Sequence, residues 1–178
     1  MLKAKSVSRI VFFAGLIFLC GFANAQGASA SLADNMVLGS GDTIITGPNS
    51  TVDINLGVNG DVLRVEPDST LKIDQLDVTR VSPPIVNTKL DVTKGGVTAN
   101  VINKLASASR YEVKTPSGVA GIRGTIFNAN VGTGISCLHG QVNVTSAGGV
   151  SVSLFAGQTA APGAAQPAAI AQAILAQS

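Results

Sequence analysis

Aromatic and charged residues are scarce in this chain. It has no tryptophan and one tyrosine, and charged residues make up 12% of its 178 residues. Beyond residue 25 the only aromatic residues are Tyr111, Phe127 and Phe155. This scarcity argues against stacking platforms for single-stranded nucleic acid, and against carbohydrate sites built on aromatic faces.

Cysteine and histidine are almost absent as well. The chain has two cysteines and one histidine, and Cys137 and His139 could lie on one strand face. A structural zinc site needs four such ligands, and a Cys–His enzyme needs an exposed thiol with a third, orienting group. A Ser–His–Asp triad would need His139 as its base, and no Gly-x-Ser-x-Gly elbow accompanies it. We therefore predict no catalytic residue, metal or cofactor, with Cys137 buried as a small apolar side chain and His139 outside or near a turn.

The N-terminus has the pattern of a secretion signal. Three basic residues precede an uncharged apolar run over 10–22, and Ala23-Asn24-Ala25 supplies the small-x-small pattern of a cleavage site. The run is shorter than the ~20 residues of a spanning helix. We predict a signal peptide over 1–25, cleaved after Ala25, and a periplasmic or secreted product with no stable membrane span. An uncleaved anchor is the alternative, and a lipoprotein through Cys20 is disfavoured because Leu19 precedes it.

Removal of the leader changes the charge. Lys3, Lys5 and Arg9 are three of the 12 basic residues, and none of the 10 acidic residues lies in the first 25. The remaining 153 residues therefore carry 9 basic and 10 acidic side chains, which leaves no basic patch for nucleic acid or a membrane surface. Their length suits one domain with its own core.

The pattern after the leader is that of β structure. Runs of Val, Ile, Thr and Leu alternate with Gly, Asn, Asp, Ser and Pro, and the weak stretch 101–109 is the best helical candidate. We predict a mobile lead-in over 26–36, a β domain over 37–158 and an Ala/Gln-rich tail over 159–178. Within the tail, residues 168–177 are either disordered or a short helix that caps the β domain.

An internal repeat defines the first part of the β domain. Residues 41–54 match residues 60–73 at a constant offset of 19, with Gly-Asp, Pro, Ser-Thr and the closing Ile identical. Each copy predicts strand, turn and strand. In the second copy the inward positions are Leu63, Val65, Leu71 and Ile73.

Two architectures suit such a repeat: a meander or sandwich of stacked hairpins, and a solenoid of stacked coils. We predict an all-β fold of the short β-solenoid or roll type, with stacked β-hairpins as the alternative. In a solenoid Asp42 and Asp61 would stack and could form a calcium ladder, but capping of the turns by the aspartates fits the motif better.

Residues 113–158 resemble the FecR-type domain, the periplasmic part of iron-dicitrate-type transmembrane regulators. The motifs that carry the resemblance are Thr115-Pro116, the run 122–127 (Ile-Arg-Gly-Thr-Ile-Phe), the strand 140–144 (Gly-Gln-Val-Asn-Val) and Ala156-Gly157-Gln158. The resemblance extends more loosely over 41–158. It implies an extracytoplasmic module that works by protein contact. The regulators also carry a cytoplasmic segment that binds a sigma factor; here we expect a signal in its place, so the anti-sigma activity is not carried over.

We expect the motif residues to be mainly structural. Glycines at 118, 121 and 124 fall every third residue and would permit bulges or the close approach of a neighbouring segment. Phe127 is expected to anchor the core. Arg123 has two interpretations, a structural side chain that holds turn carbonyls or a carboxylate, and a contact for an anion or a partner, of which the first is favoured. The family-motif residues are Thr115, Pro116, Gly121, Arg123, Gly124, Thr125, Phe127, Gly140 and Gly157.

The sequence therefore predicts an exported, non-enzymatic module that binds an envelope protein through a strand edge or a coil face. One alternative is a self-assembling surface or matrix component, a homo-oligomer joined through its coil ends. A second alternative is a β-helix carbohydrate-active enzyme, which would need carboxylates and basic residues clustered on one face.

Overall fold

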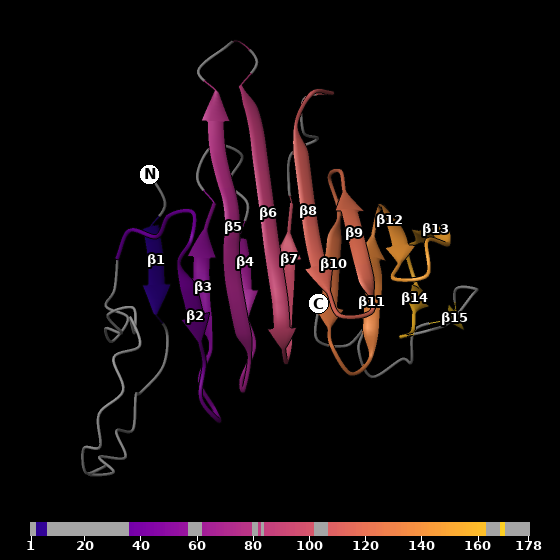
Figure 1. Cartoon of the computed structure of the whole chain (residues 1–178), viewed down its shortest axis with the longest axis horizontal. Helices are drawn as coiled ribbons and strands as arrows, with labels where there is room; N and C mark the ends of the chain where they lie inside the picture. The colour runs from indigo at the N-terminus through magenta and orange to yellow at the C-terminus, as the bar shows by residue number, and fades with distance from the viewer. Residues whose placement is uncertain are drawn as a thin grey trace, which may run out of the picture.

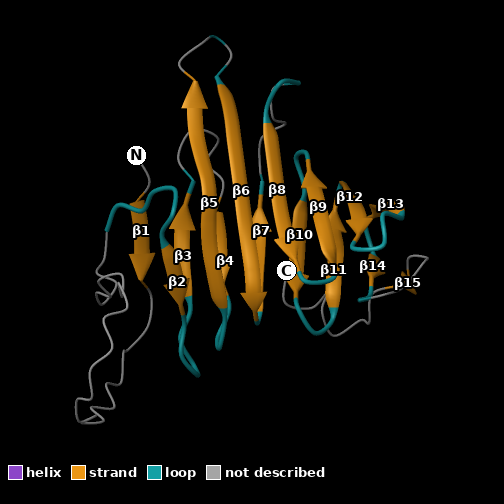
Figure 2. Cartoon of the chain, in the orientation of Figure 1, coloured by secondary structure: helices purple, strands orange, loops and turns teal. Residues whose placement is uncertain are grey.

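The computed structural model describes residues 3–6, 36–56, 62–79, 82, 84–101, 107–162 and 168–169. Most of the predicted signal peptide, the lead-in up to residue 35 and most of the tail lie outside these ranges. Every regular element among the described residues is a β-strand, which confirms the predicted all-β class (Figure 2). None of the described residues forms a helix that could span a lipid bilayer.

The strands form two sheets. Sheet A runs, in spatial order, β1 (Lys3–Ser6), β3 (Val52–Asn55), β4 (Val62–Val65), β7 (Gly96–Asn100), β10 (Ile126–Asn130), β11 (Gly134–His139), β14 (Gln158–Ala160) and β15 (Ala168–Ala169). Sheet B runs β13 (Ser151–Phe155), β12 (Gln141–Ser146), β9 (Gly118–Ile122), β8 (Arg110–Thr115), β6 (Ile85–Lys94), β5 (Thr70–Thr79) and β2 (Thr43–Ile45).

The chain passes back and forth between the two sheets as it advances along them. It makes one or two strands in one sheet and then crosses to the other, so chain order and spatial order run together, as the colour gradient of Figure 1 shows. Successive strands of the chain run in opposite directions. Neighbours that are separated along the chain by two strands of the other sheet, such as β4 and β7 or β9 and β12, are therefore antiparallel, as are the directly connected β3 and β4. Only one strand, β7, separates β6 from β8, and this pair is parallel.

The repeat has the predicted strand–turn–strand form, but its copies do not stack as coils. The first copy leads from β2 in sheet B to β3 in sheet A, and the second leads back from β4 to β5. β3 pairs with β4 and β2 with β5, both antiparallel. The predicted solenoid of parallel coils is therefore not what the structure shows; the stacked-hairpin alternative describes it. Alternation within a strand cannot distinguish the two, because it is the same in either direction.

The turns of the two copies are equivalent. Asn49 and Asp68, which are 19 positions apart, both adopt left-handed backbone angles, with φ of 59° and 53°. Asn and Asp tolerate this conformation better than other side chains do. Asp42 caps its own turn by accepting a hydrogen bond of 2.7 Å from the Gly39 amide, as predicted. Asp61 lies outside the described residues.

The core lies between the sheets and consists of aliphatic rows. The predicted inward side chains Leu63, Val65, Leu71 and Ile73 are all at most 1% exposed. Across the core, Phe127 of sheet A meets Tyr111 of sheet B edge to face, with ring centroids 6.2 Å apart. Phe127 is the largest of the fully buried side chains, which confirms its predicted role as an anchor.

The ends of the domain differ in detail from the prediction. β14 reaches Ala160, two residues beyond the expected boundary, and Ala168 and Ala169 pair with β14 as a strand rather than as the start of a helix. The remainder of the tail lies outside the described residues, as do residues 102–106 of the weak helical candidate.

We expect Phe127→Ala to lower the free energy of unfolding of the chain lacking residues 1–25 by about 3–5 kcal/mol, because it leaves a cavity between the sheets. Phe155→Ala is the matched control: Phe155 is 56% exposed, and its loss should change stability by no more than ~0.5 kcal/mol. Urea denaturation followed by circular dichroism measures both. Equal losses in the two variants would contradict the assigned core.

Candidate functional site

The FecR-like motif residues gather mainly at one end of the sandwich, which we call the signature end. It is the end where β9 leads to β10, β11 to β12 and β13 to β14. The register places these connections together, because Ile122 pairs with Val142, which pairs with Leu154, and Ile126 pairs with His139.

At the signature end the β9–β10 connection is locked against the β11–β12 connection. Gly124 and Gly140 both have left-handed φ, of 71° and 85°. A methyl group on Gly140 would lie 2.6 Å from Thr125 Cγ2 and 2.9 Å from the Gly124 carbonyl oxygen. The Val101 amide donates to the Thr125 carbonyl over 3.0 Å and ties the same connection to the end of β7. Three of the predicted motif residues therefore form one closely packed unit, which we call the structural joint: Gly124, Thr125 and Gly140.

A bulge in β11 adjoins this joint. Phe127 pairs with Cys137 whereas Ile126 pairs with His139, so the intervening Leu138 is an extra residue in β11. The Gly157 amide donates to the Cys137 carbonyl over 2.9 Å and holds the β13–β14 connection beside the bulge.

Cys137 and His139 form no reactive pair. Cys137 is fully buried, and its Sγ lies 3.7 Å and 3.4 Å from the carbonyl oxygens of His139 and Gly140. Burial raises the pKa of the Cys137 thiol, which keeps the sulfur protonated near neutral pH. His139 is exposed at the end of β11. Both positions agree with the prediction.

The remaining motif residues lie elsewhere. Thr115 and Pro116 are at the opposite end, where Thr115 Oγ1 donates to the Gly118 carbonyl over 3.2 Å. A methyl group on Gly118 would lie 2.5 Å from the Thr145 carbonyl oxygen, so the expected close approach occurs there. A methyl group on Gly121, in the middle of β9, would lie 3.7 Å from the Asn143 carbonyl oxygen, which is an ordinary contact distance.

Arg123 is the one motif residue with an exposed charged side chain. It lies directly after β9, and within the described part of the chain it makes no ion pair or side-chain hydrogen bond. The other two arginines whose side chains are described each face a carboxylate, Arg64 with Asp53 at 2.7 Å and Arg110 with Glu112 at 3.9 Å. The favoured interpretation of Arg123 as a structural side chain therefore finds no support in these contacts.

Two further exposed residues lie beside Arg123 on the rim of sheet B. Ile122 pairs with Val142, so Arg123, which follows Ile122, lies beside Gln141, which precedes Val142. Gln141 in turn pairs with Phe155. Arg123, Gln141 and Phe155 thus follow one another across three neighbouring strands, and we call them the Arg123 patch. The sequence analysis did not single out Phe155. The alternation of β13 could have indicated its exposure, because Val152 and Leu154 point inward and Phe155, next to Leu154, therefore points outward.

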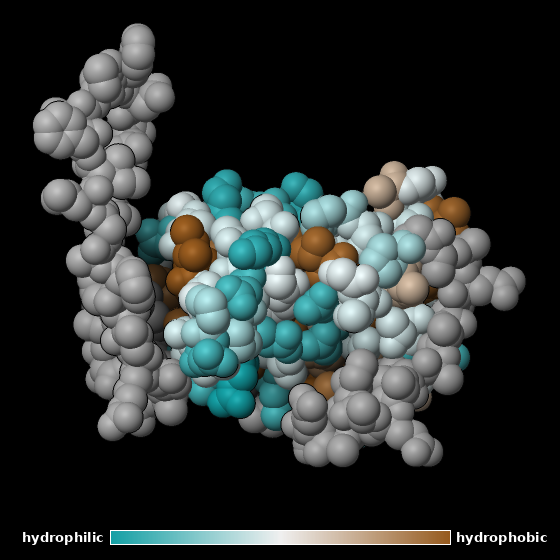
Figure 3. Space-filling model, turned by 90° about the horizontal axis from the view of Figure 1, so that it is seen from below, coloured by the Kyte–Doolittle hydropathy of each residue, from teal (hydrophilic) through white to brown (hydrophobic). Residues whose placement is uncertain are grey.

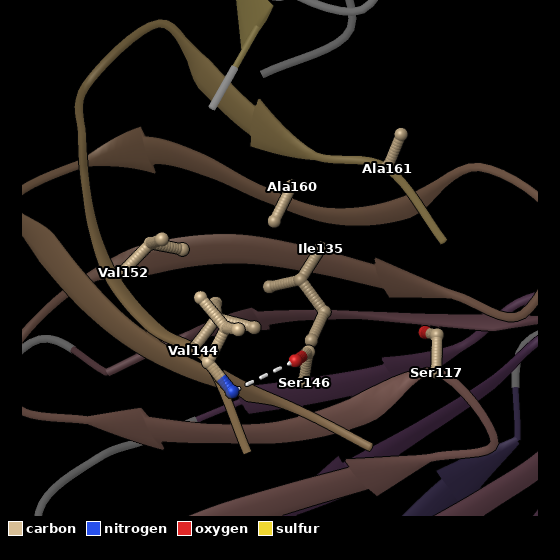
Figure 4. Close-up of a pocket in the computed structure, with 8 residues that line it drawn as sticks. Ser117, Ile135, Val144, Ser146, Val152, Ala160 and Ala161 are labelled. Carbon is tan, nitrogen blue, oxygen red and sulfur yellow. Dashed lines mark hydrogen bonds between the residues drawn. The ribbon is translucent and has the colours of Figure 1, made fainter. Parts of the chain in front are cut away.

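A small cavity lies between the sheets at the β11–β14 side of the domain. This cavity of ≈ 20 Å³ lies among Ile135, Val144, Val152 and Ala160, enough for a single water (Figure 4). Beside it, Ser146 Oγ accepts the Val150 amide over 3.1 Å. Seen end-on from below, the surface is a mosaic of small hydrophilic and hydrophobic areas (Figure 3).

Two carboxylates lie among lysines on the outer face of sheet B, where Asp91 pairs by register with Lys72 on one side and Lys114 on the other. Asp74 and Asp91 accept from Lys72 and Lys114 at 2.8 Å and 3.0 Å. Glu66 accepts from Thr98 and Asn128 on the outer face of sheet A. No group of three or more His, Cys, Asp or Glu side chains is placed to hold a metal among the residues described.

Comparison with known proteins gives one family and one fold. The family model described as FecR protein matches residues 42–143. Two crystal structures of a candidate anti-sigma factor from Parabacteroides distasonis superpose with TM-scores of 0.54 and 0.55, at 13% and 12% sequence identity. Each superposition covers 71% of this chain and 58% of the other, so the chain spans little more than half of that protein. No curated protein matches the chain.

Gly140 and Gly157 allow a matched test of the joint. Both have left-handed φ, of 85° and 84°, but a methyl group on Gly157 would meet nothing within 4 Å. We expect Gly157→Ala to cost about 1–2 kcal/mol of unfolding free energy for the backbone conformation alone. Gly140→Ala should cost a further ~1–3 kcal/mol for overpacking against Thr125. Equal losses, measured by urea denaturation, would show that the two connections are not tightly packed.

Proposed function

Because the chain belongs to the FecR family, we propose that it is an exported, non-enzymatic module that acts in cell-envelope signalling by binding another protein. The family match over 42–143 carries this proposal. The geometry supports it, because the motif residues build a structural joint and leave an exposed patch rather than a reactive centre.

The superposed structures support a regulatory role of the same general kind. That protein is described as a candidate anti-sigma factor, and the fold is what the two chains share. The chain spans 58% of its length. We therefore propose protein binding for the β domain alone, without a sigma factor as the partner.

Export is the part of the proposal that rests on the N-terminal residues. Small side chains at 23 and 25 after an apolar run suit cleavage by a signal peptidase. In the structure β1 pairs with β3, so removal of residues 1–25 would make β3 the edge of sheet A.

We expect the full chain, expressed in a Gram-negative host, to yield a periplasmic or secreted product that begins at Gln26. Ala25→Phe should cause the precursor to accumulate, because a large side chain does not fit the cleavage pocket, whereas Ala30→Phe should be processed normally. Intact-mass spectrometry of the fractionated product measures this. A wild-type product that retains residues 1–25 in the membrane would contradict export as proposed.

Protein binding can be tested at Phe155. We expect a photo-crosslinking phenylalanine derivative at Phe155, in the exported chain within its native envelope, to give one discrete heavier product, because the Arg123 patch faces the partner. The control places the same group at Ile45, an apolar residue of β2 that is 75% exposed at the far edge of sheet B. Absence of a product at Phe155, or identical products at both positions, would contradict the proposal.

Self-assembly is a second candidate, and the β13 edge favours it. β13 ends sheet B and carries neither a charged residue nor a proline, the features that commonly keep edge strands from pairing with other chains. A crosslinked product with twice the mass of the chain would support this candidate in place of a different partner.

A further inference from the structure

We infer that the Arg123 patch recognises a carboxylate next to an apolar side chain in an extended segment of a partner protein. The inference rests on the proposed function and adds the chemistry of the partner. Four observations carry it: the charge around Arg123, the count of cations, the rigidity of its backbone and the exposure of Phe155.

The charge distribution leaves Arg123 without a carboxylate of its own. From residue 124 to residue 178 the sequence contains no Asp, Glu, Lys or Arg. β10, β11, β12 and β13 therefore offer it no acidic side chain. Glu112, which lies opposite Gly121, is the nearest acidic residue by register, and it faces Arg110 at 3.9 Å. A guanidinium in this position is available to a carboxylate from outside the chain.

One cation suits a carboxylate better than a phosphate. Recognition of a phosphate with close to two negative charges commonly uses several arginines. The Arg123 patch contains one cation, and Arg110 on the neighbouring strand β8 faces Glu112 at 3.9 Å, so that pair adds no net charge. Its charge therefore matches the single negative charge of an Asp or Glu side chain.

The backbone that carries Arg123 is held on both sides. Ile122 before it is 4% exposed and Thr125 after it is 1% exposed. Gly140 packs so closely against Gly124 and Thr125 that no methyl group fits between them. The guanidinium is therefore presented from a fixed support, and binding need not order the backbone, which lowers the entropic cost.

Phe155 supplies the apolar half of the patch. Of the three aromatic side chains in the described residues, Tyr111 and Phe127 are buried and Phe155 is 56% exposed. Neighbouring strands are ~4.8 Å apart, so Phe155 lies about 10 Å from the Arg123 backbone, across β12. In an extended segment, side chains two residues apart point the same way and are ~7 Å apart, and the long Arg123 side chain can close the difference. Exposed arginines and aromatic residues dominate many protein interfaces.

The test is a titration of the 15N-labelled chain lacking residues 1–25, followed by NMR. The probe is the capped pentapeptide Thr-Glu-Thr-Leu-Thr, and its control has Gln in place of Glu. We expect the Glu peptide to shift the amides of Arg123, Gln141 and Phe155, and to bind about fivefold more tightly than the Gln peptide.

Two variants assign the preference. Arg123→Gln should abolish the difference between the peptides, while Lys94→Gln should retain it. Lys94 is a matched control because it is exposed, has no ion pair within the described part of the chain, and lies at the opposite end of sheet B. Phe155→Ala should weaken the binding of the Glu peptide and of the Gln peptide by the same factor. An unchanged thermal transition in Arg123→Gln shows that the fold is retained.

Three results would overturn the inference: equal binding of the two peptides, a preference that survives Arg123→Gln, or no amide shift up to ~5 mM peptide. The crosslink at Phe155 could still form in each case, so the proposed function would stand with a different partner chemistry. Conversely, peptide binding without any crosslink would leave the carboxylate preference in place and remove the proposed function.

Discussion

Burial of alternate side chains between two sheets is the constraint on which the rest of the structure depends. Sheet A contributes residues such as Leu63 and Phe127, and sheet B contributes Leu90 and Val113, all at most 1% exposed. Each fully buried aliphatic side chain is worth ~1.5–3 kcal/mol. Neither sheet could bury its apolar face alone, and the chain crosses from one sheet to the other after every one or two strands.

The crossings explain where the glycines of the FecR signature lie. A chain that leaves one sheet and enters the other within a few residues needs tight connections, and neighbouring connections at one end must pack against each other. Gly124 and Gly140 meet in this way, and a side chain on Gly140 would collide with Thr125. The signature at this end therefore describes a structural joint first, and the exposed Arg123 is held in place by it.

The polar groups of the described residues are largely held in the fold. Cys137 is buried and protonated, the carboxylates are spread over ion pairs and hydrogen bonds, and the cavity between the sheets has room for one water. Two features distinguish the surface: the guanidinium of Arg123 makes no ion pair among the described residues, and the exposed phenyl ring of Phe155 lies on the same rim, across β12. The chain belongs to the FecR family, and the protein binding proposed for it would use such a surface.

By itself, the sequence determined the local features. Alternation placed Leu63, Val65, Leu71 and Ile73 inside, Pro-Asn and Pro-Asp marked the turns, and the motifs of 113–158 identified the family, because each depends on near neighbours in the chain. Only the tertiary structure decided that the repeat copies run antiparallel in two sheets, because alternation reads the same in both directions. It also decided that Arg123 makes no ion pair among the described residues and that Phe155 lies on the same rim, because these depend on which strands become neighbours.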